Sequence, residues 1–219
     1  MFSREEAEII YNVIDKDTLR DNFSFVAFFI AVYENFAHLI KEQIKGFYTT
    51  GFEKSEDGTI REILLPAYTE KIKTRLVDTK GNKDELKASV LWLVDHEAFS
   101  MQDYEAFLKM KEQRNLFAHQ LTEVVVRGCS EEEIKLFFDM FALYQKFDRW
   151  WINEIEIPTA GQFLPGEYDP ESVESVITEL FQLMIETLYL DQSENLKAFV
   201  KRNTEQEDSK AYNEQNNQG

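Results

Sequence analysis

Cysteine, glycine and proline are scarce in this chain of 219 residues, which contains one cysteine, eight glycines and four prolines. A single cysteine, Cys129, cannot form a disulfide within the chain, which fits the reducing conditions of the cytoplasm. Because glycine and proline form many of the turns of β-rich proteins, their scarcity argues against an all-β fold. The sequence MFSREEAEII at the N-terminus also lacks the basic and then apolar segments of a signal peptide. We therefore expect a cytoplasmic protein that is not β-rich.

Positive charge is also in short supply, because 24 lysines and arginines stand against 41 aspartates and glutamates, for a net charge of −17. A surface this acidic repels nucleic acids and anionic membranes. Any nucleic-acid site must therefore be a local basic patch. The longest apolar run, FVAFFIAVY at residues 25–33, is shorter than the roughly 20 residues that a membrane helix needs. We expect this run to be a buried helix, and we expect no contact with a membrane.

The common short motifs of enzymes are absent from the sequence. It contains no GxGxxG, P-loop, HExxH, CxxC or GxSxG pattern, so nucleotide, zinc and serine-hydrolase chemistry have no support. A ferritin-like di-metal site needs a glutamate three residues before a histidine, and none of the three histidines has one. We therefore expect neither a metal site nor a cofactor.

What the chain does contain is a series of helix start signals, in which Ser, Asn or Asp precedes acidic residues and a periodic apolar pattern. The helix that Asn22 caps should run to about Phe47, the helix after Asp169 should continue to Leu188, and residues 193–201 should form a further short helix. These signals predict an all-α bundle of about six to eight helices. They lie at residues 3–6, at Asn22, and at residues 82–85, 100–103, 130–133 and 169–172.

Three stretches do not follow the helical pattern. Residues 51–81 contain turn sequences around Pro66 and form either a β-hairpin or helices broken at that proline. Residues 157–166 read as a loop, and residues 203–219 lack an apolar face, which is typical of a disordered tail. We expect one helical domain over residues 1–202, with residues 51–81 as an irregular insertion.

The sequence RNLFAH at residues 114–119 places an arginine, an asparagine and a histidine within six residues of a predicted helix. On an ideal helix of about 100° per residue, Arg114 lies in the middle of an apolar stripe, and His119 lies about 140° away, on the side of Asn115. Burial of a lone arginine is unfavourable unless the charge is paired. Arg114 therefore has a carboxylate partner, or the stripe is a surface that another subunit or a ligand completes. The stripe consists of Phe107, Met110, Phe117, Leu121 and Val124.

The charge around this segment differs from that of the whole chain. Lys109, Lys111 and Arg114 outnumber the single glutamate in residues 109–120, so the local field favours a bound phosphate. Histidine can give or take a proton near neutral pH. Arginine can hold two phosphate oxygens and stabilise charge that develops on them. These residue types suit the cleavage of RNA by its own 2′-hydroxyl.

The sequence RNLFAH also resembles the R-x(4–6)-H motif of the HEPN superfamily, whose all-helical domains occur in many prokaryotic ribonuclease toxins, abortive-infection proteins and CRISPR effectors. The resemblance implies an HEPN-like helical core, a homodimer that brings two motifs together, and metal-independent cleavage of RNA. In that reading His119 is the general acid or base, Arg114 stabilises the phosphate, Asn115 supports them, and Lys109 and Lys111 bind phosphate. An antitoxin is then a possible partner, in toxin or phage-defence biology.

Some HEPN proteins bind nucleotides or partners without cleaving anything. The alternative is therefore a non-catalytic helical protein of HEPN-like fold with an interaction or regulatory role, which the net charge of −17 favours.

Other residues that could carry chemistry have simpler explanations. His38 lies on an aromatic-rich helix, where we expect it in the core, and His96 lacks metal-ligand spacing, so we expect it at the surface. Trp150 and Trp151 are expected to pack or to form an interface. Cys129 precedes a helix start, a position that can lower the pKa of a thiol, but no catalytic base is paired with it.

Overall fold

The computed structural model describes residues 10, 15–77, 79–159 and 169–189. The chain divides into two compact units, residues 1–147 and 148–219. Helices dominate, and the sheet within the described residues has two strands, so the predicted all-α bundle is confirmed. The helix start signal at residues 3–6, the predicted helix at residues 193–201 and the predicted tail lie outside the described residues.

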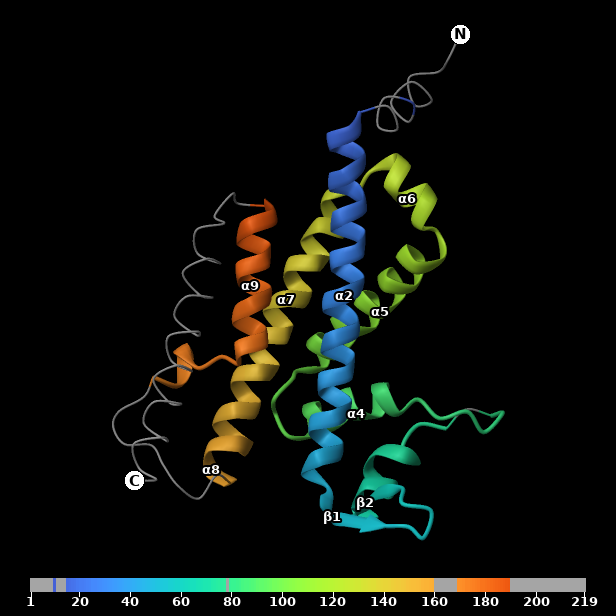
Figure 1. The fold of residues 1–219 in the computed structure, drawn as a ribbon, viewed down its shortest axis with the longest axis vertical. Helices are drawn as coiled ribbons and strands as arrows, with labels where there is room; N and C mark the ends of the chain where they lie inside the picture. The colour runs from blue at the N-terminus through green and yellow to red at the C-terminus, as the bar shows by residue number, and fades with distance from the viewer. Residues whose placement is uncertain (1–9, 11–14, 78, 160–168, 190–219) are drawn as a thin grey trace. The chain divides into compact units, whose positions relative to one another are not determined.

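Helix α2, Lys16–Phe47, is the central element of the first unit (Figure 1). Its cap is Asp15, whose carboxylate accepts a hydrogen bond from the backbone N–H of Thr18 at 3.0 Å. The prediction that Asn22 caps this helix is therefore wrong, although the predicted end at Phe47 is confirmed. The Asn22 side chain instead donates to the carbonyl of Val125 at 3.1 Å, which ties the helix to a distant part of the chain.

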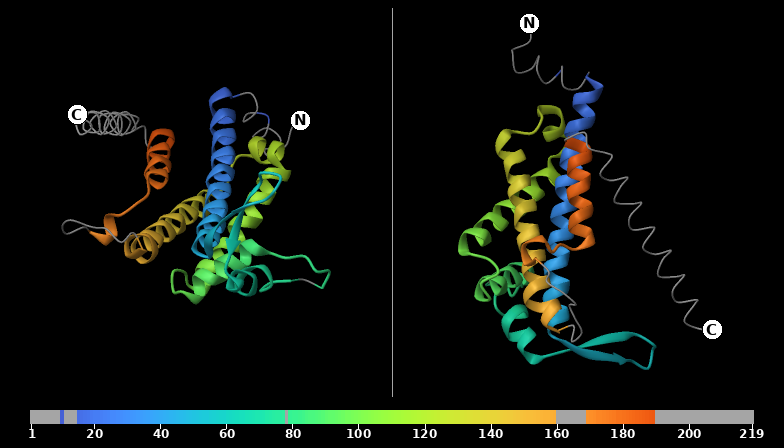
Figure 2. Two further views of the ribbon diagram at one scale, coloured as in Figure 1. Left: turned by 60° about the horizontal axis from the view of Figure 1, so that its bottom comes forward. Right: turned by 90° about the vertical axis from the view of Figure 1, so that its left-hand side faces the viewer.

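The core of the first unit is built largely from aromatic rings on the buried face of α2. Phe29 lies 5.0 Å from Phe117 of helix α5 (Met101–His119), measured between ring centroids. Phe25 lies 5.5 Å from Phe137 of helix α7 (Glu131–Trp151), which extends into the second unit. Figure 2 shows α5 alongside α2 in two further views. The predicted burial of residues 25–33 is confirmed for most of the run. Its buried members are Phe25, Val26, Phe28, Phe29, Val32 and Tyr33.

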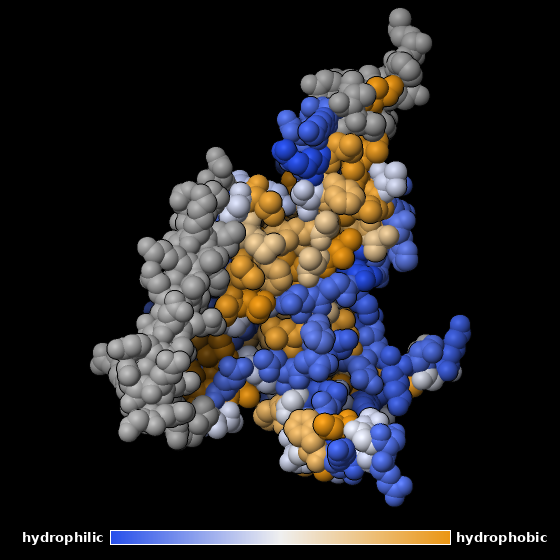
Figure 3. All heavy atoms as spheres, in the orientation of Figure 1, coloured by the Kyte–Doolittle hydropathy of each residue, from blue (hydrophilic) through white to orange (hydrophobic). Residues whose placement is uncertain are grey.

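The opposite face of α2 is exposed. In Figure 3, hydrophilic residues cover its first turns, hydrophobic residues follow toward its middle, and hydrophilic residues predominate again over its C-terminal half. His38 lies on this exposed side, so the prediction that it belongs to the core is wrong. Within the described residues, α2 is also the one helix that is long and apolar enough to cross a bilayer by length and composition alone, and half of its most apolar window is buried inside the fold.

Local capping explains where the other helices of this unit begin. Ser100 and Asp103 form the predicted capping box at the start of α5. Ser130 and Glu133 do the same for α7, with the backbone N–H of Ser130 donating to Glu133 at 2.8 Å. Helix α4, Glu85–Asp95, is capped by Asp84, two residues after Asn82, where the predicted start signal begins. The short helix α6, Leu121–Arg127, follows α5 after a bend at Gln120.

Both alternatives for residues 51–81 describe part of this segment. Strands β1 (Thr49–Lys54) and β2 (Ile60–Leu64) pair antiparallel, with Lys54 opposite Ile60. Gly58 lies in the connecting turn at a φ of 85°, which favours glycine. Helix α3, Pro66–Tyr68, then begins at the predicted proline and continues into a π-helical turn, Thr69–Lys73.

In the second unit, the last turn of α7 is followed by a π-helical turn, Ile152–Glu156, and by helix α8, Ile157–Thr159. Residues 157–159 are therefore helical, and not the loop that the sequence predicts, while residues 160–166 lie outside the described part. The helix expected after Asp169 is also interrupted. Asp169 caps a 3₁₀ turn, Pro170–Ser172, and helix α9, Val176–Tyr189, begins only after an extended break.

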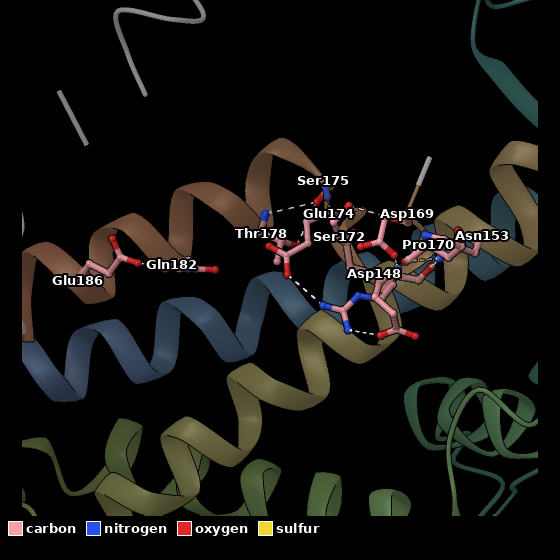
Figure 4. A network of polar contacts seen from close by, with 12 residues as sticks. Asp148, Asn153, Asp169, Pro170, Ser172, Glu174, Ser175, Thr178, Gln182 and Glu186 are labelled. Atoms are coloured by element: carbon pink, nitrogen blue, oxygen red, sulfur yellow. Dashed lines mark hydrogen bonds and ion pairs between the residues drawn. The ribbon is translucent and has the colours of Figure 1, made fainter. Parts of the chain in front are cut away.

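A polar network in the second unit explains this break (Figure 4). The buried carboxylate of Asp148 accepts hydrogen bonds from the backbone N–H of Ser175 at 2.6 Å and from the hydroxyl of Thr178 at 2.8 Å. Arg149 pairs with Glu174 at 3.3 Å. Asp148 thus satisfies donors in the first turn of α9, and this sets where the helix begins.

Candidate functional site

The RNLFAH sequence forms the C-terminal part of α5, and the helix ends at His119. Phe117 is completely buried against α2, while Asn115, Leu116 and His119 are exposed. Aromatic packing of Phe117 therefore fixes the orientation of the segment, with polar residues on both sides of the buried stripe.

Arg114 faces α2, as the helical wheel predicts. Its side chain is 31% exposed, and its Nη2 forms an ion pair with the carboxylate of Glu34. Its Nη1 donates to Oδ1 of Asn115 at 3.1 Å. Of the two sequence-based alternatives for Arg114, a carboxylate partner is therefore confirmed. The third donor, Nε, is buried and has no hydrogen-bond partner among the described residues.

Tyr33 lies next to Glu34 in sequence and is the second buried polar group at this place. Only 3% of Tyr33 is exposed, and its ring lies 5.7 Å from that of Phe107. Its hydroxyl oxygen is buried without a hydrogen-bond partner in the described part of the chain. Burial raises the pKa of Tyr33, the charge of Glu34 raises it further, and the charge of Arg114 opposes this rise. The side chain is therefore a neutral hydroxyl that can donate.

The two predicted phosphate-binding lysines are in different situations. Lys111 Nζ lies 3.1 Å from Oδ2 of Asp84, the residue that caps α4. Burial would raise the pKa of Asp84, but hydrogen bonds from the backbone of Lys87 and from Lys111 outweigh it and lower the pKa. Lys109 is exposed and has no ion pair within the described residues. Lys111 is thus held in place, whereas Lys109 is available to solvent.

His119 is the predicted proton-transfer residue and the last residue of α5. It is exposed and makes no hydrogen bond within the described part of the chain. The structure therefore brings Arg114 and Asn115 into contact but does not pair His119 with either of them. Its imidazole is free to meet a ligand or a second subunit.

A buried charge cluster close to the site holds α5 against α7. The carboxylate of Glu133 receives two bonds from Arg127, at 2.6 and 3.0 Å, and one from Gln113 of α5 at 2.8 Å. Burial would raise the pKa of Glu133, but these bonds outweigh it and lower the pKa. Every acceptor position of this carboxylate is in use, so the cluster has a structural role.

The other candidates from the sequence carry no catalytic arrangement. Burial raises the pKa of Cys129 to about 11 and outweighs any lowering by the helix start that follows it. His96 is exposed, as predicted, and stacks on Trp92 with 3.8 Å between ring centroids. Trp151 is buried, in agreement with a packing role. A groove of about 360 Å³ between α5 and α7 contains none of the motif residues.

Glu34 and Tyr33 are the site residues that sequence reasoning misses. Both lie on α2, eighty residues or so before the motif, and no local pattern pairs them with Arg114. At this place two carboxylates, those of Glu34 and Asp84, are paired with the cations Arg114 and Lys111, and Lys87 also lies 3.9 Å from Asp84.

Comparisons with protein-family models, with curated proteins and with solved structures found no match. No group of three or more His, Cys, Asp or Glu side chains that could hold a metal ion occurs among the described residues. The function is therefore argued from the arrangement of Arg114, Asn115 and His119.

Proposed function

We propose that the protein is a metal-independent endoribonuclease of the HEPN type, with an active site made by two subunits of a homodimer. The observation that supports it best is the end of α5, where a half-buried arginine is oriented by Asn115 and an exposed histidine follows one turn later. Arginine and histidine are the residue types that phosphodiester cleavage needs in the absence of a metal.

In the proposed reaction the 2′-oxygen of one nucleotide attacks its own 3′-phosphate, and the bond between phosphorus and the 5′-oxygen breaks. One histidine takes the proton of the 2′-hydroxyl, and another gives a proton to the departing 5′-oxygen. Arg114 binds the non-bridging oxygens and stabilises the charge that develops on them. The products are a 2′,3′-cyclic phosphate and a 5′-hydroxyl.

The dimer follows from the number of histidines that this chemistry uses. One chain has one His119, which is exposed and makes no contact with Arg114. A two-fold axis near the end of α5 would bring two copies of His119 and two of Arg114 into one groove. Leu116, which lies between Arg114 and His119 in the sequence, is exposed and offers apolar surface for contact between the two subunits. RNA enters this groove, Lys109 adds positive charge at its rim, and an antitoxin could bind the same face.

The ion pair between Glu34 and Arg114 favours a second candidate, a non-catalytic helical protein with an interaction or regulatory role. In this reading the arginine has a purely structural function, and the net charge of −17 keeps nucleic acids away. The two candidate functions predict different results with RNA, because the ribonuclease cleaves it and the non-catalytic protein does not.

The test is cleavage of varied RNAs by the purified protein in the presence of a metal chelator. We expect wild type to cleave, and His119→Ala and Arg114→Ala each to lower the rate by about 100-fold or more, as is typical of general acid–base and charge-stabilising residues. His96→Ala, which removes the other exposed histidine at a helix end, is the matched control and should keep full activity. Equal cleavage by all variants, or none by wild type, would overturn the enzyme proposal.

A further inference from the structure

At the contact between α2 and α5, two hydrogen-bond donors are buried without an acceptor among the described residues. One is the hydroxyl of Tyr33, and the other is Nε of Arg114. A buried polar atom without a partner destabilises a folded protein, and native structures contain few of them. Two such donors at the candidate site indicate that an acceptor occupies this place in another state of the protein.

Electrostatic interactions show that the two donors belong to one polar environment. The charges of Glu34, Arg114 and Asp84 all act on the hydroxyl of Tyr33. Its ring is fixed by packing on Phe107, so the hydroxyl has little freedom to find another partner. The hydroxyl is therefore held in place as a donor within the electrostatic reach of Arg114.

Glu34 is the group that can move. Its side chain is 50% exposed, compared with 31% for Arg114 and 3% for the whole of Tyr33. An ion pair between partly exposed side chains is held by little free energy, because water competes for both groups. Rotation of Glu34 into solvent costs it few contacts and frees Nη2 of Arg114, while Tyr33 and the arginine stem stay in place.

We propose that Arg114 Nη2, once Glu34 has left it, binds one non-bridging oxygen of an RNA phosphodiester, and that Tyr33 Oη and Arg114 Nε donate to the same phosphate group. This inference rests on the proposed role of Arg114 in phosphate binding. It adds Tyr33 as a second residue that binds the phosphate, and it implies that Glu34 competes with the substrate phosphate for Arg114.

The charges at the site favour a phosphodiester over a free phosphate. Asp84 stays paired with Lys111 and Lys87 when Glu34 leaves, so the positive charge of Arg114 is left without its carboxylate partner. A phosphodiester carries one negative charge and neutralises it. Inorganic phosphate is largely a dianion above neutral pH, and its second charge is repelled by Glu34 and Asp84. The site should therefore discriminate between the two sources of a phosphate group.

The experiment is titration of the full-length protein with two probes, an all-2′-deoxy oligonucleotide that cannot be cleaved through its 2′-position, and inorganic phosphate. Tyr33→Phe should weaken oligonucleotide binding by about tenfold, the effect of one hydrogen bond to a charged group. It should leave the free protein at least as stable as wild type, since the lost hydroxyl has no partner. Glu34→Gln should tighten binding of both probes.

Tyr144→Phe is the matched control. The hydroxyl of Tyr144 is also buried beside α2, but it donates to Asn35 at 2.8 Å. Tyr144→Phe should therefore lower the stability of the protein and leave oligonucleotide binding unchanged, which is the reverse of what we expect for Tyr33→Phe. Wild type should bind the oligonucleotide more tightly than inorganic phosphate.

The outcomes separate this inference from the proposed function. If Arg114→Gln abolishes oligonucleotide binding while Tyr33→Phe has no effect, the role of Tyr33 is overturned and that of Arg114 stands. If neither change alters binding, or if wild type binds neither probe, both are overturned. Weaker binding by Glu34→Gln would contradict the competition between Glu34 and the phosphate.

Discussion

The guanidinium of Arg114 on α5 forms an ion pair with the carboxylate of Glu34 on α2, and a hydrogen bond of 3.1 Å joins the same guanidinium to Asn115. The contact connects the RNLFAH motif to the central helix of its unit. It satisfies a half-buried positive charge, and it also covers the group that would bind a phosphate. Under the proposed function, stability and activity should therefore depend on Glu34 in opposite ways.

The first prediction concerns the opposite effects of Glu34 on stability and on RNA cleavage. Glu34→Gln should raise the rate of RNA cleavage at low substrate concentration, because the phosphate no longer competes with a carboxylate. It should cost at most about 1 kcal/mol of stability, since both partners are partly exposed. Initial rates and urea unfolding of the two proteins measure these effects. A lower rate with unchanged stability would mean that Glu34 assists the reaction.

The second prediction concerns the pH dependence of stability. Hydrogen bonds from Arg127, Ser130 and Gln113 hold the pKa of Glu133 below its unfolded value of 4.5. A carboxyl with a lowered pKa contributes stability above its unfolded pKa and loses it as pH falls through the folded pKa. Glu133→Gln should therefore cost about 1–2 kcal/mol at neutral pH. Its stability should also fall less steeply than that of wild type below about pH 4.5.

Urea unfolding from pH 3 to pH 7 measures this difference. The control is Glu131→Gln, which changes an exposed carboxyl in the same turn of α7. Parallel stability curves for wild type and Glu133→Gln would contradict the assignment.

The third prediction concerns the start of α9. Asp148→Ala removes the acceptor of the Ser175 N–H and of the Thr178 hydroxyl, and it should cost about 1–2 kcal/mol. Hydrogen exchange should speed up in the first turn of α9. Asp139→Ala, on the exposed side of α7, should leave that exchange unchanged. Equal protection of α9 in both variants would show that another group sets its start.

The fourth prediction concerns the end of α4. Glu97 has a φ of 60°, a backbone conformation that is unfavourable for residues other than glycine. The backbone N–H of the next residue, Ala98, donates to the carbonyl of Leu93 at 3.0 Å. Glu97→Gly should stabilise the protein by about 0.5–1 kcal/mol. Ala142→Gly, in the interior of α7, should destabilise it by a similar amount. Thermal unfolding distinguishes the two signs, and a loss of stability in Glu97→Gly would contradict the strain.

Helix starts that depend on local bonds could be predicted, as Ser100 and Ser130 show, because a capping box is complete within four residues. The start of α2 could not, because Asp15 and Asn22 are both good caps and a bond from Asn22 to distant Val125 decides between them. The break before α9 depends in the same way on Asp148, which lies on another helix.

In the candidate site, too, the features that depend on local geometry could be predicted, and those that depend on packing between distant helices could not. The helical wheel predicts that Arg114 faces the apolar side and needs a carboxylate, because that follows from helix geometry alone. Which carboxylate pairs with it depends on how α5 packs on α2, and the sequence carries no local signal for Glu34 or for the buried hydroxyl of Tyr33. The predicted burial of His38 is wrong because this residue, one turn after Glu34, lies on the exposed side of an otherwise aromatic-rich helix.

An active site that combines His119 from two subunits, as proposed, can be tested by mixing wild-type and mutant subunits. Wild-type protein is exchanged with a threefold excess of His119→Ala subunits, and RNA cleavage is measured at constant total protein. If both histidines are needed in one groove, only dimers of two wild-type subunits cleave, and activity falls to about one sixteenth. Activity of about one quarter, the share of wild-type subunits, would mean that each chain acts alone and would contradict the shared site.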